Sequence, residues 1–211
     1  MKYASLILSL SALMIITSCA KPEIIPAPSN DIEYRAHFKG LVNGAEVEFT
    51  EHVEDFFCET EKYVDTIPGI PNSDSSFCIY YSQIKSEQQT IKQSIGIGLG
   101  WLEFNPTITS TPALNQFKEF FEESSTYDFV TLAEEGAQVV YIDETGKVWT
   151  SGDGGAGETF EIVEMEQVSD DTGDYLIFTA NFTCQLYFYD ANGNPSSITI
   201  QDAVYEGVFK R

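Results

Sequence analysis

Apolar and polar residues alternate along most of the chain after residue 32, with the period of two that is typical of half-buried β-strands. The first such stretch, residues 34–49, runs through Asn43-Gly44. Asn-Gly is the strongest short signal for a β-hairpin because both turn positions require a positive φ. The sequence therefore predicts an opening hairpin. Further strands are predicted at residues 77–84, 91–104, 129–132, 138–142, 147–150, 159–168, 175–189 and 197–209.

One segment has a helical period instead. Apolar residues recur at helical spacing from Leu114 to Phe121, Thr111 can cap such a helix, and Pro112 suits its first position. The strands otherwise follow one another without intervening helices, which favours antiparallel pairing. We predict an all-β fold, an antiparallel β-sandwich or a partly open barrel with one short amphipathic α-helix.

Three glycines alternate with apolar residues in one of the predicted strands. Gly96, Gly98 and Gly100 lie within the strand, and the chain has no Gly-Lys-Ser/Thr sequence, which argues against a phosphate-binding loop. We expect the glycines to clear one strand face so that the amphipathic helix can approach closely.

The start of the chain has the composition of a secretory signal peptide. Lys2 is followed by an apolar run at residues 6–16 and by small residues that suit cleavage. The sequence Ile16-Thr17-Ser18-Cys19 resembles the lipobox of bacterial lipoproteins, whose cysteine is acylated after cleavage. The resemblance implies that Cys19 anchors the protein in a lipid bilayer.

The domain organisation follows from this anchor. Residues 1–18 form the expected signal peptide, and residues 19–31 form a proline-rich tether with extended backbone. No second linker interrupts residues 32–211, a length within the ordinary range for a single β-domain.

The charge of the chain limits its partners. The formal charge is −22, from 33 acidic and 11 basic side chains, and removal of residues 1–18 takes away one lysine and no acid. Nucleic acids are bound through clustered Lys and Arg, which this chain lacks. We expect no nucleic acid partner.

Three cysteines follow Cys19. Cys184 alternates in step with large apolar residues, which predicts a buried thiol. Cys58 and Cys78 flank a polar segment, and a bridge between them would close a loop of about twenty residues, worth roughly 3 kcal/mol. The sequence leaves both a bridge and free thiols open.

Catalytic signatures are sparse. His37 and His52 are the two histidines, and neither accompanies a nucleophile motif or a zinc-ligand spacing. We predict no catalytic residue, although paired carboxylates of a glycan-acting hydrolase cannot be identified from sequence. Asp190, Asn192 and Asn194 stand at the first, third and fifth positions of a loop, as in a calcium-binding EF-hand, but Pro195 and Gln201 depart from that motif. The same residues suit a simple hairpin turn.

Two further features carry resemblances. Asp65-Thr66-Ile67 resembles the O-glycosylation site of envelope proteins from gut and oral bacteria, which implies a glycan on Thr66. The lipobox, the proline-rich tether, the opening hairpin and the segments 146–151, 181–187 and 204–209 together resemble small uncharacterised lipoproteins of gut and oral Bacteroidota.

The family resemblance implies a location and a class of function. We expect a lipoprotein of the cell envelope, sorted to the outer membrane and facing either the periplasm or the exterior. Its expected role is a non-enzymatic binding or scaffold module that contacts a glycan or an envelope protein. The alternatives are a subunit of a pilus-like surface assembly and a glycan-acting hydrolase.

Overall fold

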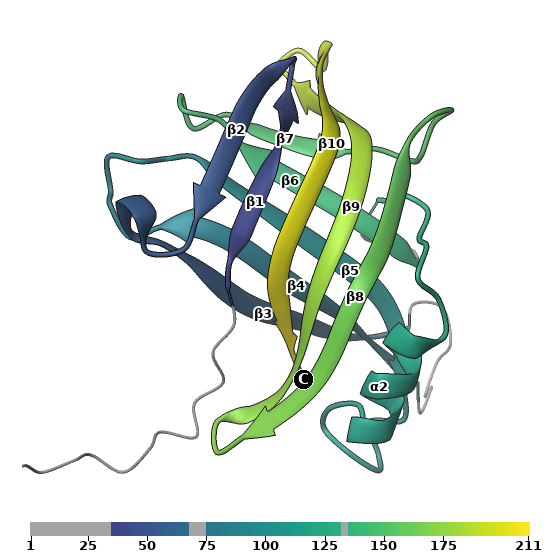
Figure 1. The fold of residues 1–211 in the computed structure, drawn as a ribbon. Helices are drawn as coiled ribbons and strands as arrows, with labels where there is room; N and C mark the ends of the chain where they lie inside the picture. The colour runs from purple at the N-terminus through teal and green to yellow at the C-terminus, as the bar shows by residue number, and fades with distance from the viewer. Residues whose placement is uncertain (1–34, 68–74, 132–134) are drawn as a thin grey trace, which may run out of the picture. The chain divides into compact units, whose positions relative to one another are not determined.

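A computed structural model describes residues 35–67, 75–131 and 135–211. These residues form one antiparallel sheet in the order β2-β1-β10-β9-β7-β6-β5-β4-β3, and β8 pairs with β9 beside this path (Figure 1). The strands are β1 (His37–Val42), β2 (Ala45–Thr50), β3 (Phe56–Thr66), β4 (Ser76–Ser86), β5 (Ser94–Phe104), β6 (Gly136–Ile142), β7 (Val148–Ser151), β8 (Thr159–Asp170), β9 (Gly173–Tyr189) and β10 (Pro195–Lys210).

The opening hairpin is confirmed. β1 and β2 pair in register from His37 with Thr50 to Val42 with Ala45. Asn43 and Gly44 have φ angles of 52° and 80°, the left-handed conformation that a two-residue hairpin turn requires.

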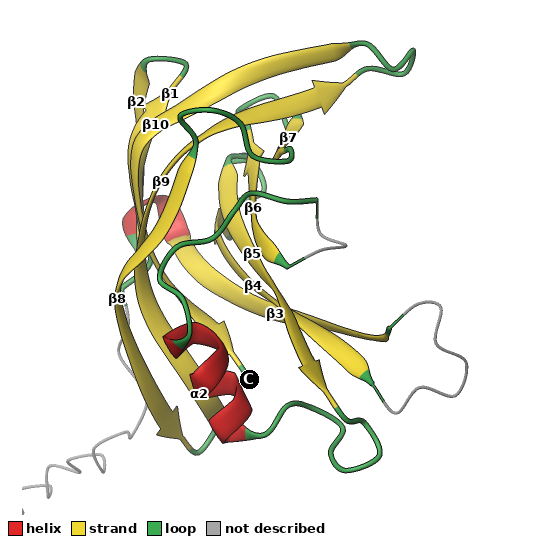
Figure 2. Cartoon of the chain, turned by 90° about the vertical axis from the view of Figure 1, so that its right-hand side faces the viewer, coloured by secondary structure: helices red, strands yellow, loops and turns green. Residues whose placement is uncertain are grey.

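The sheet curls into a half-barrel whose inner face holds the hydrophobic core. β1, β2, β8, β9 and β10 lie on one side, and β3 to β6 lie on the other (Figure 2). The all-β prediction is confirmed, and a single continuous sheet corresponds to the partly open barrel that we predicted as the alternative to a sandwich.

The two sides of the sheet meet at the buried hydroxyl of Ser82 on β4. Its Oγ lies 2.9 Å from the hydroxyl of Tyr205 and 3.3 Å from the Sγ of Cys58, and it accepts a hydrogen bond from the amide of Val208 at 3.3 Å. β1 pairs with β10 only as far as Glu206. Beyond this point the Ser82 hydroxyl takes the place of β1 and accepts the hydrogen bond from the Val208 amide. This bond matters because a buried amide without a partner is costly in free energy.

Gly207 allows this close approach. A Cβ atom at this position would lie 2.4 Å from Cε1 of Tyr205 and 2.7 Å from Oγ of Ser82. Both Ser82 and Tyr205 have no exposed surface. The contact between β4 and β10 thus depends on a position without a side chain.

The single described α-helix, α2 (Leu114–Glu122), covers the core where the two sides of the sheet spread apart (Figure 2). Phe117 and Phe121 are fully buried. Phe117 packs edge-on against Tyr80 at 5.0 Å, and Phe121 stacks on Phe209 at 5.3 Å between ring centroids. An amphipathic helix at this position is confirmed.

The predicted cap of this helix is wrong. The helix begins after Ala113, so Thr111 and Pro112 both precede it. The side chain of Gln116 accepts a hydrogen bond from the amide of Ala113 at 3.0 Å. This glutamine satisfies the amide of the residue before the helix, whereas a capping hydroxyl would have accepted from an amide of the first turn.

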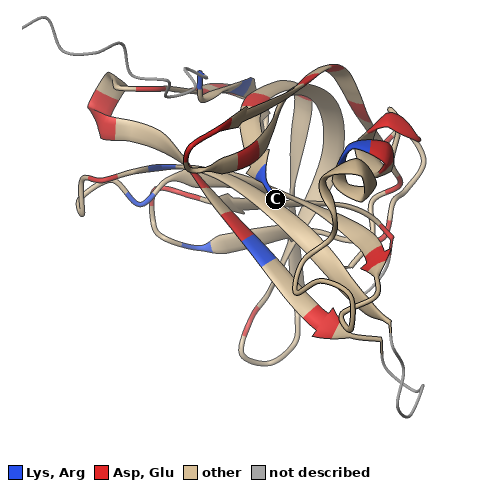
Figure 3. Ribbon diagram, turned by 90° about the horizontal axis from the view of Figure 1, so that it is seen from below, with Lys and Arg blue, Asp and Glu red and all other residues tan. Residues whose placement is uncertain are grey.

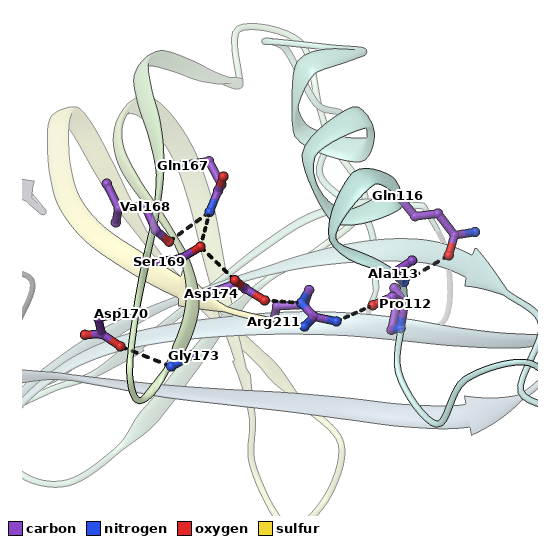
Figure 4. Close-up of polar contacts among 10 residues, drawn as sticks. All are labelled: Pro112, Ala113, Gln116, Gln167, Val168, Ser169, Asp170, Gly173, Asp174 and Arg211. Atoms are coloured by element: carbon purple, nitrogen blue, oxygen red, sulfur yellow. Dashed lines mark hydrogen bonds and ion pairs between the residues drawn. The ribbon is translucent and has the colours of Figure 1, made fainter.

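The last residue, Arg211, links the β8–β9 hairpin to the start of α2 (Figure 4). Its Nε donates to Oδ2 of Asp174 at 2.6 Å, and its Nη1 donates to the carbonyl of Pro112 at 2.9 Å. Hydrogen bonds from Ser169 and Arg211 lower the pKa of Asp174, so its carboxylate stays charged in this contact.

Two parts of the strand prediction are wrong. β3 was not predicted, because its second half is exposed on both faces and its apolar residues Tyr63 and Val64 are adjacent and do not alternate with polar ones. The strand expected at residues 129–132 is reduced to one bridge between Phe129 and Ala137, and residue 132 lies outside the described residues.

Acidic residues are spread over the strands and α2, with few basic residues between them (Figure 3). Within the described ranges, no helix is long and apolar enough to cross a membrane.

We predict that Gly207→Ala lowers the free energy of unfolding by about 1–3 kcal/mol, because the new methyl group forces Tyr205 or Ser82 to move. Gly96→Ala is the matched control, since its Cβ would meet its nearest neighbours at 3.4–3.5 Å, an ordinary contact. Denaturant unfolding of both variants measures the difference. Equal stability of the two variants would contradict the proposed packing.

Candidate functional site: a groove on the convex face

Two rows of cross-strand neighbours bring polar and aromatic residues together on the convex face of the sheet. Paired residues of adjacent strands share a face. One row joins Glu61, Tyr81 and Gly98, and the other joins Glu59, Gln83, Gly96 and Val140. The residues between them along each strand, such as Ser82 and Ile97, point into the core.

These two rows line a groove of about 170 Å³, which we call the convex groove. Gly96 and Gly98 form its floor, since they contribute no side chain, and Tyr81 and Gln83 from β4 stand beside them. Glu59 and Glu61 form the rim on β3. A groove of this size is smaller than the roughly 300–1,000 Å³ of enclosed small-molecule sites. It suits one ring of a larger ligand.

The polar groups of the groove have defined states. Glu59 forms an ion pair with Lys85. Burial raises the pKa of the Tyr81 hydroxyl, and the neighbouring Tyr63 raises it further, so the hydroxyl stays protonated. The groove therefore offers an aromatic ring, a hydroxyl, an amide and two carboxylates to a ligand.

The expected role of the three glycines is corrected by this arrangement. α2 packs on Tyr80 and Phe209, which face the core, whereas Gly96 and Gly98 open on the opposite face. The space beside Gly100 is filled by Ile79, since a Cβ at Gly100 would lie 3.1 Å from Cγ1 of Ile79. The glycines leave the groove open and do not receive the helix.

Both histidines border a second cavity, of about 410 Å³, beside β1 and β2. His37 Nε2 lies 3.2 Å from Oε1 of Glu48, and this hydrogen bond is the main reason that the pKa of Glu48 is lowered. Glu51 accepts the amide of Ala36 at 3.2 Å. These side chains hold the first strands together, and Arg35, the first described residue, forms part of the wall.

The Cys58–Cys78 bridge that the sequence left open is not formed. Both thiols are free and buried. Cys58 pairs with Ile84, six positions along β4 from Cys78, which places them roughly 20 Å apart at 3.4 Å per residue. A disulfide requires Cα atoms within about 7 Å. Cys184 is a free thiol with 2% exposure, as predicted.

The loop proposed for calcium is a hairpin turn. Oδ1 of Asp190 accepts the amides of Asn192 and Asn194, both at 2.8 Å, and Oδ2 accepts the side-chain amide of Asn194 at 3.0 Å. Hydrogen bonds from Asn194 lower the pKa of Asp190. In the described part of the chain, no three His, Cys, Asp or Glu side chains are placed to hold a metal ion together.

The sequence predicted two modification sites, Thr66 and Cys19. Thr66 is exposed at the end of β3, and its amide donates to Oδ1 of Asp65 at 2.7 Å. Cys19, the predicted lipidation site, lies outside the described residues.

The convex groove was not identified from the sequence. Glu59 and Glu61 lie on the strand that was not predicted, and Tyr81 and Gln83 became neighbours of the glycines only through the register of β4 and β5. The alternating glycines were the signal that could have located it. Comparison with known proteins gives no match, whether with family models, curated proteins or solved structures.

We predict that calcium and a chelator leave the melting temperature unchanged, because the Asp190 oxygens are already engaged in the turn. Asp190→Ala should lower the melting temperature slightly through loss of these bonds. Thermal unfolding with and without calcium measures both effects. A shift with calcium that Asp190→Ala abolishes would restore the metal site.

Proposed function

We propose that this chain is a lipid-anchored lipoprotein of the bacterial cell envelope whose β-domain binds a carbohydrate in the convex groove without catalysis. The observation that carries the proposal is the glycine floor on β5 directly beside Tyr81 on β4, with the acidic rim on β3 at the other side of Tyr81. It gives a flat ligand ring access to an aromatic side chain and to hydrogen-bonding groups at once.

The backbone of this region supports a ligand recognised by side chains. β4 and β5 each pair with strands on both sides, so their amides and carbonyls are used within the sheet. A peptide added as an extra strand needs a free sheet edge, which β4 and β5 do not offer. A hydroxyl-rich ligand needs only the carboxylates, the amide and the phenol that the groove presents.

The negative charge of the chain favours a neutral carbohydrate over an anionic one. The chain carries a formal charge of −22, and two glutamates form the groove rim. An anionic glycan would be repelled by this field. The hydroxyl groups of a neutral glycan can donate to Glu61 and Gln83, whose oxygens accept hydrogen bonds.

The carboxylates favour binding over hydrolysis. A glycosidase needs one carboxyl group that is protonated and a second that is charged. Glu59 is already engaged in an ion pair with Lys85, and Glu61 is exposed on the same strand. We therefore propose binding in preference to hydrolysis.

No observation favours a pilus-like subunit, since α2 already covers the open side of the core.

The anchor belongs to the same proposal. The lipobox-like sequence before Cys19 supports acylation, and more than one acyl chain holds a protein firmly in a membrane. The absence of Asp after Cys19 fits an outer-membrane destination, and the tether at residues 19–31 would carry the domain clear of the bilayer.

We predict that Tyr81→Ala lowers affinity for a neutral glycan about tenfold or more, because it removes the ring that stacks on the sugar. Gly96→Val should have the same effect by filling the groove floor. Tyr189→Ala is the control, since Tyr189 is 63% exposed and lies away from the groove. Titration calorimetry with soluble neutral oligosaccharides measures the affinities, and melting temperatures exclude misfolding. Release of shortened sugars during the titration would instead support the hydrolase.

We predict that Cys19→Ser moves the full-length protein from the membrane fraction to the soluble fraction, because the acylated side chain is lost. Fractionation of cells that express each form gives the result, and a variant that stays in the membrane would refute the anchor. Protease treatment of intact and lysed cells then distinguishes an exterior from a periplasmic domain.

A further inference from the structure

We infer that the ligand of the convex groove is a chain of several sugar units that crosses the strands and ends at Tyr187 on β9. This inference rests on the proposed function. It adds the direction in which the bound ligand lies, the length of the ligand and a second aromatic contact. The direction follows from two observations: the groove is closed along the strands, and one of its rows continues across them.

The groove is closed along the direction of the strands. The next glycine in β5, Gly100, is covered by Ile79, whose Cγ1 lies 3.1 Å from the position of a Cβ at Gly100. Ile79 is itself only 2% exposed. A ligand in the groove therefore meets a filled surface if it extends along β4 and β5 toward this end.

One row of the groove continues across the strands beyond the groove itself. The row that contains Gln83 and Gly96 continues through Val140 on β6 and Thr150 on β7 to Tyr187 on β9. Val140 and Thr150 are small, half-buried side chains. From β3 to β9 the row crosses five strand spacings, which is roughly 24 Å at about 4.8 Å each. An oligosaccharide of several units can span this distance.

Tyr187 is held in position at the far end of the row. Its hydroxyl donates to Oε1 of Gln185 at 2.9 Å. A Cβ at Gly152 would lie 3.1 Å from Cε2 of the ring, so the ring rests directly on this glycine. A ring fixed in this way loses little freedom when a sugar stacks on it, which favours binding.

The groove and the far end of the row therefore repeat one arrangement. In each place a tyrosine lies beside glycine backbone and near an amide side chain, Gln83 for Tyr81 on the neighbouring row of the groove and Gln185 for Tyr187. The small residues between them would lie under the middle of the ligand and contribute little specificity. Affinity should consequently depend on ligand length.

The test is titration of the full-length protein with a neutral, unbranched series from the disaccharide to the hexasaccharide, using β-linked and α-linked glucans. We expect affinity to rise along the series. Tyr187→Ala should lower the affinity for the hexasaccharide about tenfold. It should leave the affinity for the shortest oligosaccharide that binds unchanged. Tyr81→Ala should weaken every member.

Tyr189→Ala is the matched control, because Tyr189 is the same residue type on the same face of β9, two positions away from the row. It should bind like the unmodified protein. Melting temperatures of all three variants exclude loss of folding, and Tyr187→Phe, which keeps the ring, should retain length-dependent binding.

The outcomes separate the two proposals. Equal loss of long-chain affinity in Tyr189→Ala, or no loss in Tyr187→Ala while Tyr81→Ala loses binding, would overturn the crossing direction and leave the groove as the site. Loss of the length dependence in Tyr63→Ala would place the chain along the strands. Absence of binding to any neutral glycan would overturn the proposed function itself.

Discussion

The buried hydroxyl of Ser82 is the contact on which the half-barrel depends. A curled sheet that does not close leaves amides without strand partners where its two sides meet, and Ser82 accepts the Val208 amide and contacts the Tyr205 hydroxyl there. Because side chains alternate along a strand, this inward serine directs its two neighbours, Tyr81 and Gln83, outward. The closure of the core and the placement of the convex groove are thus two consequences of the same three residues of β4.

Glycine has opposite uses on the two faces of this sheet. Inside, Gly207 lets β10 approach the side chains of β4, and any added atom would collide with Tyr205. Outside, Gly96 has room for a methyl group at ordinary contact distance, so packing does not require a glycine there. Glycine weakens a strand by its entropy. A glycine that packing does not require therefore has a cost in stability without a structural return, which is consistent with a binding role.

The period of two along the chain was sufficient to predict the all-β class, the opening hairpin and most strands, because each depends on local sequence. The groove could not be predicted from this pattern, because it depends on the register between β3, β4 and β5, which is a non-local property. The same limit applies to Cys58 and Cys78, which flank one loop in sequence but pair with Ile84 and Val64 in the sheet. The predicted helix cap was wrong for a local reason, since the helix begins at Leu114 and Ala113, which has no hydroxyl, holds the cap position.

The floor of a site on the convex face of this sheet is rigid, because β4 and β5 beneath it each pair with a strand on both sides. Rigidity lowers the entropy that binding costs, but a shallow groove buries little of its ligand, so each contact is weak. Two properties of the proposal offset this weakness. A row of contacts across the strands lets one chain engage two tyrosines, and an anchor at Cys19 would hold many copies in one membrane. Linked weak sites gain affinity through high effective concentration. A polymer that touches several anchored domains would be retained even though a single short sugar is released.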